Sequence, residues 1–86
     1  MPEISRFYGL VITMHYNDHN PPHFHVRYGE HKALVTIQLL TVIQGELRSR
    51  ALDLVVEWAT LHQDELMQNW ELARQEQTLQ SIDPLE

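Results

Sequence analysis

The chain has no cysteine among its 86 residues, and this absence removes several kinds of chemistry at once. Disulfide bridges, thiolate metal centres and cysteine nucleophiles all need a sulfhydryl group. Basic residues are also few, since six lysines and arginines stand against twelve aspartates and glutamates, for a formal net charge of -6. This balance argues against broad, charge-driven binding to nucleic acid, because phosphate contacts need clustered lysine and arginine.

Long apolar runs are missing as well. No stretch approaches the roughly 18 residues that a membrane span needs, and the chain does not open with the charged and apolar regions of a secretory signal. We therefore expect a soluble, cytoplasmic protein. With 43% hydrophobic residues the chain is typical of a globular protein. Its length allows one modest core, because a chain of this size buries only about 60% of the surface that its unfolded form exposes.

The first half of the sequence alternates between apolar and polar side chains, which is the pattern of half-buried β-strands. The alternating segments are residues 7–16, 23–28 and 31–38. Residues 39–43 are a candidate fourth strand. Pro21 and Pro22 lack N–H donors and stiffen the loop that joins the first two segments. The pattern predicts a small antiparallel β-meander of three to four strands.

The second half has the period of a helix. Between Arg48 and His62 the apolar side chains cover one broad arc and acidic side chains line the opposite side. A second helical stretch covers about residues 64–77. We expect these C-terminal helices to pack on the sheet, with His62 buried and hydrogen-bonded to the backbone. The prediction is a single α+β domain over residues 1–78, followed by a flexible tail at residues 79–86.

Histidine is the residue that this chain has in excess. The sequence holds six, and four of them fall within the eleven residues from His15 to His25. Imidazole is the commonest metal ligand, and it is the only side chain whose unperturbed pKa lies near neutral pH. So many imidazoles in one stretch, together with a carboxylate, indicate a site, because folding alone does not require them.

Strand register should bring these side chains together. If the first two strands share one apolar face, His15 lies opposite or nearly opposite His23 or His25 on the other face. Asp18 and His19 then stand above them in the proline-stiffened loop. Three imidazoles can hold zinc with one coordination position open, and imidazole with carboxylate also suits manganese, iron or nickel. All five of these residues are candidate ligands of a divalent metal.

The same residues also suit acid and base chemistry on a phosphodiester. In this interpretation His23 or His25 acts as the base, with Asp18 as the accompanying catalytic carboxylate. Arg27 or Lys32 then steadies the phosphate. The acidic composition does not favour RNA as the substrate. Two alternatives stay open, namely a non-catalytic docking module whose histidines fill a protein interface, and a metal or small-ligand sensor.

Three parts of the sequence also resemble a known family. They are residues 4–9, the run from Asp18 to Val26, and the helical pieces Arg50-Ala51-Leu52, Glu57-Trp58 and Asn69-Trp70. Over about residues 1–74 the chain resembles the small bacterial proteins grouped as domain of unknown function 4160. The resemblance implies a shared site at Asp18, His19, His23 and His25. It does not extend to His15, because that position is more often aromatic in the family.

The resemblance further implies that the protein works with a partner. Members of the family look like neighbours of a second family of small proteins, domain of unknown function 2442, in arrangements of the toxin–antitoxin kind. We therefore expect a toxin-like component that associates with a cognate protein encoded nearby or with a second copy of itself. A membrane partner is not expected.

Overall fold

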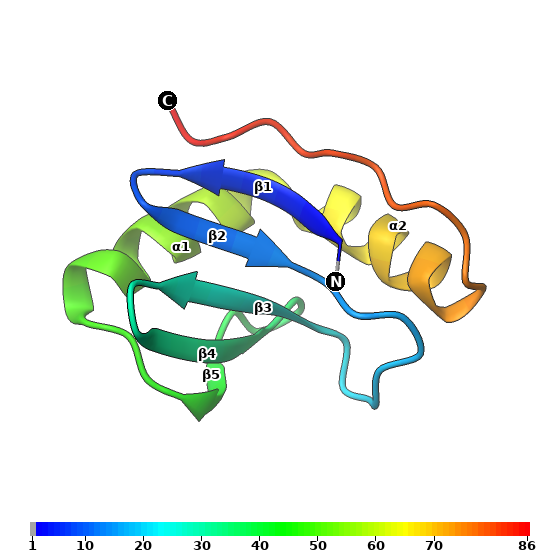
Figure 1. The fold of residues 1–86 in the computed structure, drawn as a ribbon, viewed down its shortest axis with the longest axis horizontal. Helices are drawn as coiled ribbons and strands as arrows, with labels where there is room; N and C mark the ends of the chain where they lie inside the picture. Colours follow the sequence, from blue (N-terminus) through cyan, green and yellow to red (C-terminus); the bar gives the residue numbers. More distant parts are fainter. Residues whose placement is uncertain (1) are drawn as a thin grey trace.

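The computed structural model describes residues 2–86 as one antiparallel sheet with two helices (Figure 1). The elements are β1 (Glu3–Phe7), β2 (Leu10–Thr13), β3 (His23–Tyr28), β4 (His31–Thr36), β5 (Val42–Gly45), α1 (Ser49–Leu61) and α2 (Gln63–Arg74). Each strand pairs with the next along the chain, so the sheet is a meander in the order β1-β2-β3-β4-β5. The α+β class is confirmed, but the sheet has five strands where the sequence predicts three to four.

The extra strand is β1, which ends at Phe7, where the first predicted segment begins, and a turn follows it directly. Tyr8 and Gly9 have φ angles of 49° and 81°, which reverse the chain, and Phe7 pairs with Leu10 across the turn. Because the turn has two residues, Phe7 and Leu10 are three positions apart yet both buried, so the alternation changes phase at the turn and Tyr8 is exposed. The predicted strand at residues 39–43 overlaps β5 only in part.

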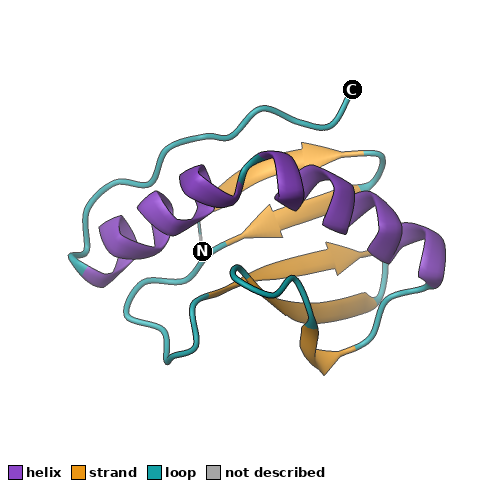
Figure 2. Cartoon of the chain, turned by 180° about the vertical axis from the view of Figure 1, so that it is seen from behind, coloured by secondary structure: helices purple, strands orange, loops and turns teal. Residues whose placement is uncertain are grey.

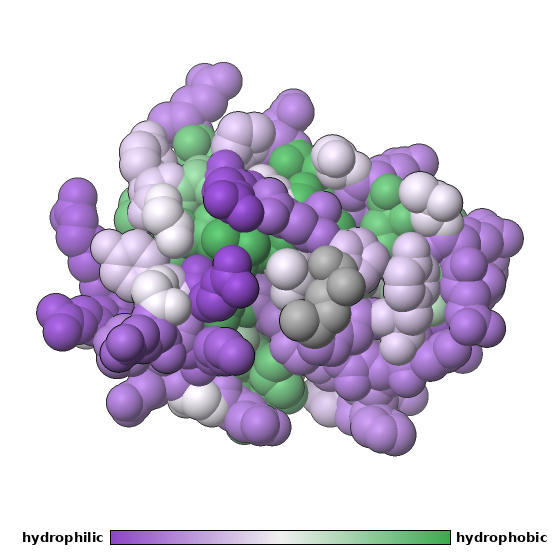
Figure 3. Space-filling view, viewed as in Figure 1, coloured by the Kyte–Doolittle hydropathy of each residue, from purple (hydrophilic) through white to green (hydrophobic). Residues whose placement is uncertain are grey.

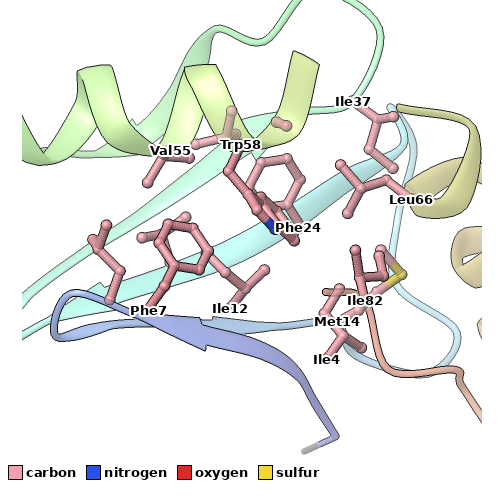
Figure 4. Packing of buried hydrophobic residues seen from close by; sticks show 14 of the residues in the cluster. Ile4, Phe7, Ile12, Met14, Phe24, Ile37, Val55, Trp58, Leu66 and Ile82 are labelled. Atoms are coloured by element: carbon pink, nitrogen blue, oxygen red, sulfur yellow. The ribbon is translucent and has the colours of Figure 1, made fainter. Parts of the chain in front are cut away.

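The helices cover one face of the sheet and leave the other face open (Figure 2). Side chains at alternate strand positions point toward the helices and are buried. On the strands and their ends these are Leu10, Ile12, Met14, Phe24, Val26, Ala33, Val35 and Ile37, and on the helices Val55, Trp58, Ala59, Leu66 and Trp70 (Figure 4). The ring of Trp58 is central, with its centroid 5.3 Å from that of Phe7 and 6.0 Å from that of Phe24.

Beyond α2 the chain runs back along β1 (Figure 1). Ile82 enters the core with 4% of its surface exposed, and its N–H group donates to the carbonyl of Ile4 at 2.8 Å. The indole N–H of Trp58 donates to the carbonyl of Asp83, also at 2.8 Å. Where the sequence predicts a flexible tail from residue 79, the structure has a segment docked along the outer edge of β1.

The junction of the two helices lies at His62, as the sequence predicts. His62 has its side chain 16% exposed and packs against Trp58, but its hydrogen-bond partner differs from the prediction. The ring Nδ1 lies 2.6 Å from Oε1 of Glu65, so the partner is a carboxylate one turn away and not the backbone. Neither helix within residues 2–86 is long and apolar enough to cross a membrane.

Candidate functional site

The open face of the sheet carries a groove of about 430 Å³. Because side chains alternate along a strand, the positions between the core residues point into it. The groove is lined mainly by Val11, Thr13, His15, His25, Arg27, Lys32, Leu34 and Gln44, from four successive strands. In Figure 3, which shows this face, apolar surface is bordered by polar side chains. Such a mixture is typical of ligand sites in proteins.

His15 and His25 lie together at one end of the groove. Their rings stack with centroids 3.7 Å apart and planes 6° from parallel. Thr13 pairs with His25, so His15 is one step further along the same face, as the strand register predicts. Burial lowers the pKa of His15, and the neighbouring His25 lowers it further, against an opposing effect of Asp18. His15 is therefore a neutral imidazole at pH 7, with a ring nitrogen free to accept a proton or a metal.

Asp18 joins two of the histidines through a single oxygen. Its Oδ2 atom lies 3.0 Å from Nε2 of His23 and 3.0 Å from Nε2 of His25, and its Oδ1 accepts the backbone N–H of His19. Burial raises the pKa of Asp18, but the hydrogen bonds from His25 and His19 and the charges of His23 and His25 hold it below its usual range. The carboxylate is therefore ionised at neutral pH and can only accept hydrogen bonds.

His23 lies behind this carboxylate and is buried, with 4% of its surface exposed. Its Nδ1 is 2.8 Å from the carbonyl oxygen of Pro21, and its ring rests 5.3 Å from that of Trp70. Both ring nitrogens therefore lie within hydrogen-bond distance of a protein oxygen, Nδ1 of the Pro21 carbonyl and Nε2 of the Asp18 carboxylate. The side chain thus links the Pro21 carbonyl to Asp18 and orients the carboxylate.

Three residues meet the geometric requirement for a metal site. One ligand atom each from His15, Asp18 and His25 lies within 4.8 Å of the other two. Within residues 2–86, no other group of three histidine or acidic side chains brings its ligand atoms together in this way. Two imidazoles with one carboxylate form the ligand set of many mononuclear metal centres, with further coordination positions open to water or substrate. The link from the Pro21 carbonyl through His23 to Asp18 is the kind of supporting hydrogen bonding that orients such ligands.

The structure does not bring every predicted ligand into this group. His19 is exposed and contributes only its backbone N–H. His23 meets the group through Asp18, and its predicted role as a catalytic base stays a prediction. Arg27 and Lys32 do line the groove. Sequence reasoning missed the groove itself, although the strand alternation that exposes Thr13, Leu34 and Gln44 beside the histidines is present in the sequence.

Comparison with known proteins yields one match. The sequence profile of the family described as Domain of unknown function (DUF4160) matches residues 9–71. The matched region runs from the first hairpin into α2 and includes every residue from His15 to Lys32. Neither a curated protein nor a solved structure matches the chain.

Proposed function

The chain belongs to the family of domain of unknown function 4160, and from this premise we propose that it binds a divalent metal ion through His15, Asp18 and His25. The observation that carries the proposal is that the three side chains converge within 4.8 Å at the end of a groove. Zinc, manganese, iron and nickel all suit two imidazoles and a carboxylate. The proposed setting is the cytoplasm, where the protein acts as the toxin-like component of a two-protein module.

The proposed chemistry is hydrolysis of a phosphodiester in the groove. A divalent ion held by His15, Asp18 and His25 would supply a water of lowered pKa and would stabilise negative charge on a phosphoryl oxygen. The water oxygen would form one bond to phosphorus while one phosphorus–oxygen bond breaks, and the proton that the water loses would pass to the departing oxygen. In this scheme His15 and His25 hold the ion at the groove end, and His23 acts through Asp18 as a positioning residue.

A second candidate mechanism needs no metal. The contact between His25 and Asp18 orients one imidazole, and the stacked His15 places a second, neutral imidazole beside it. Two adjacent imidazoles can supply a base and an acid. Phosphodiester hydrolysis that survives chelation and thorough dialysis supports the metal-free mechanism. Hydrolysis that is lost on chelation and restored by a single metal supports the metal-dependent one. A protein without either activity, but with a partner seated in the groove, is a docking module.

Metal affinity tests the proposal most directly. Titration of tag-free protein with zinc and manganese at pH 7 is expected to show one site. His25→Ala should weaken it by about 100-fold or more, because a ligand is lost where even supporting residues are worth about 10- to 100-fold. His19→Ala is the matched control from the same stretch, and it should bind as the wild type does. The absence of binding by the wild type, or equal losses in the two variants, contradicts the proposal.

The toxin-like role is tested in cells. Expression of the chain alone is expected to slow growth, and coexpression with the small protein encoded beside it should restore growth and give a complex that copurifies. His25→Ala should relieve the growth defect while the protein stays folded, and His19→Ala should not. Growth that is unaffected by the wild-type chain, in cells shown to accumulate it, contradicts this role.

A further inference from the structure

Two positive charges face each other on the open side of the sheet. Arg27 on β3 and Lys32 on β4 are directly paired across the strands, and both line the groove. Like charges in this position destabilise a sheet. The chain has only six lysines and arginines, and two of them are placed opposite each other. The fold could form without this repulsion, which lowers the stability of the sheet.

Within residues 2–86, neither Arg27 nor Lys32 forms an ion pair. The hydrogen bond from Arg6 is the main cause that lowers the pKa of Glu3. The charge of Arg27 lowers the same pKa by a smaller amount. Arg6 holds the Glu3 carboxylate at 2.7 Å. Two unpaired cations on one groove wall are suited to a ligand that brings its own negative charge.

The spacing of the two charged ends of the groove indicates which kind of ligand. Arg27 follows His25 by two positions on one strand, and a strand rises about 3.3 Å per residue, so the two side chains start roughly 7 Å apart. Consecutive phosphates along a single nucleic-acid strand have a similar separation. Between and beside these ends the groove presents Val11 and Leu34, which give an apolar surface for an unstacked base or sugar.

We propose that the groove binds single-stranded nucleic acid, with one phosphate held by Arg27 and Lys32 and the neighbouring phosphate at His15, Asp18 and His25. The position of the second phosphate rests on the proposed function, while the first depends on the two cations alone. A single strand is required, because in a duplex the bases are stacked inside and cannot reach the apolar floor.

Five of the twelve acidic side chains of the chain lie on the two helices. The exposed carboxylates of the helices are Asp53, Glu57, Asp64, Glu65 and Glu71. The helices cover the far side of the sheet from the groove (Figure 2). Nucleic acid is repelled from that side and can approach through the open face. The five helical acids are thus kept away from the two cations of the groove, in a chain whose formal net charge is -6.

Binding of a labelled single-stranded RNA oligonucleotide tests the proposal, measured by fluorescence anisotropy with EDTA present. The double variant Arg27→Gln, Lys32→Gln should bind at least about tenfold more weakly. Its plot of log affinity against log salt should be shallower by about 0.7, the contribution of one phosphate on a single strand. Arg74→Gln is the control, because it removes an exposed cation that is paired with Glu71 on α2. It should bind as the wild type does.

Stability gives an independent reading of the same variants. Lys32→Gln should raise the melting temperature of the free protein, because it ends the repulsion, while it weakens RNA binding.

A duplex of the same sequence and a mononucleotide should both bind more weakly than the single strand. The proposal is overturned if the wild type does not bind RNA in EDTA, if the double variant binds equally well, or if the duplex binds best. Metal titration of the double variant separates the two proposals, since an intact metal site leaves the proposed function standing.

Discussion

Phe24→Ala is expected to lower the free energy of unfolding by about 3–5 kcal/mol, as for other buried aromatic residues. The side chain is fully buried, and its ring meets Trp58 nearly edge-on, with an interplanar angle of 77°. The substitution removes this contact and leaves a cavity between the sheet and α1. Chemical denaturation in EDTA measures the loss without any contribution from bound metal.

The neighbouring residue supplies the matched comparison. His25 is on the opposite face of β3 with its side chain 23% exposed, so His25→Ala should change the free energy of unfolding by only about 0.5 kcal/mol. Phe24→Leu is the fallback if the alanine variant does not fold, with an expected cost below about 1.5 kcal/mol because it keeps most of the volume. Equal losses for Phe24→Ala and His25→Ala would make His25 a structural residue and would remove the basis of the open-face site.

Asp18→Ala is expected to have the second largest effect, on both metal affinity and stability. It removes one ligand and the acceptor that holds His23, whose side chain is 5% exposed. Loss of a partner by a buried polar group costs about 1–3 kcal/mol. Metal affinity should fall by about 100-fold or more, as for loss of His25. Denaturation curves and metal titrations on the same preparation measure both quantities.

The sign of the pH dependence follows from the lowered pKa of Asp18 in the folded state. The stabilisation by this carboxylate is fully present above the unfolded pKa of about 3.9, and it is lost as the pH falls through the lower folded-state value. Asp18→Ala should therefore differ most from the wild type near neutral pH, and the gap should narrow in acid. Asp53→Ala, an exposed carboxylate on α1, is the control. A gap that stays constant into acid contradicts the role assigned to Asp18.

The faces of the sheet could be predicted from the sequence, but its turns could not. Alternation placed Phe24 and Val26 in the core and His25 on the open face, because a strand offers only two directions for a side chain. The turn at Tyr8 and Gly9 is different. A positive φ angle is unusual for a tyrosine, and the pair Tyr-Gly is not the Asn-Gly or Asp-Gly pair that usually marks a two-residue hairpin turn. Docking of Ile82 was also hidden, because it depends on an edge that exists only once the sheet has formed.

The site shows the same division between local pattern and long-range packing. Strand register predicted that His15 would approach His25, and these rings stack in the structure. The burial of His23 depends on Trp70, which comes from a helix more than forty residues later, so no periodicity within the strand could reveal it. His19 lies in a loop, where the direction of each side chain depends on individual backbone angles and not on a repeat.

The contact between Trp70 and His23 gives the protein an optical reporter of its own site. The indole is buried, and its centroid is 5.3 Å from that of the His23 imidazole, which is hydrogen-bonded to the Asp18 carboxylate. Indole emission responds to charge in its surroundings, so a cation bound by Asp18 changes the electric field at Trp70. The second tryptophan, Trp58, lies beside His62 and not beside the three candidate metal ligands. Occupancy of the open face can therefore be followed in the unlabelled protein by its intrinsic fluorescence.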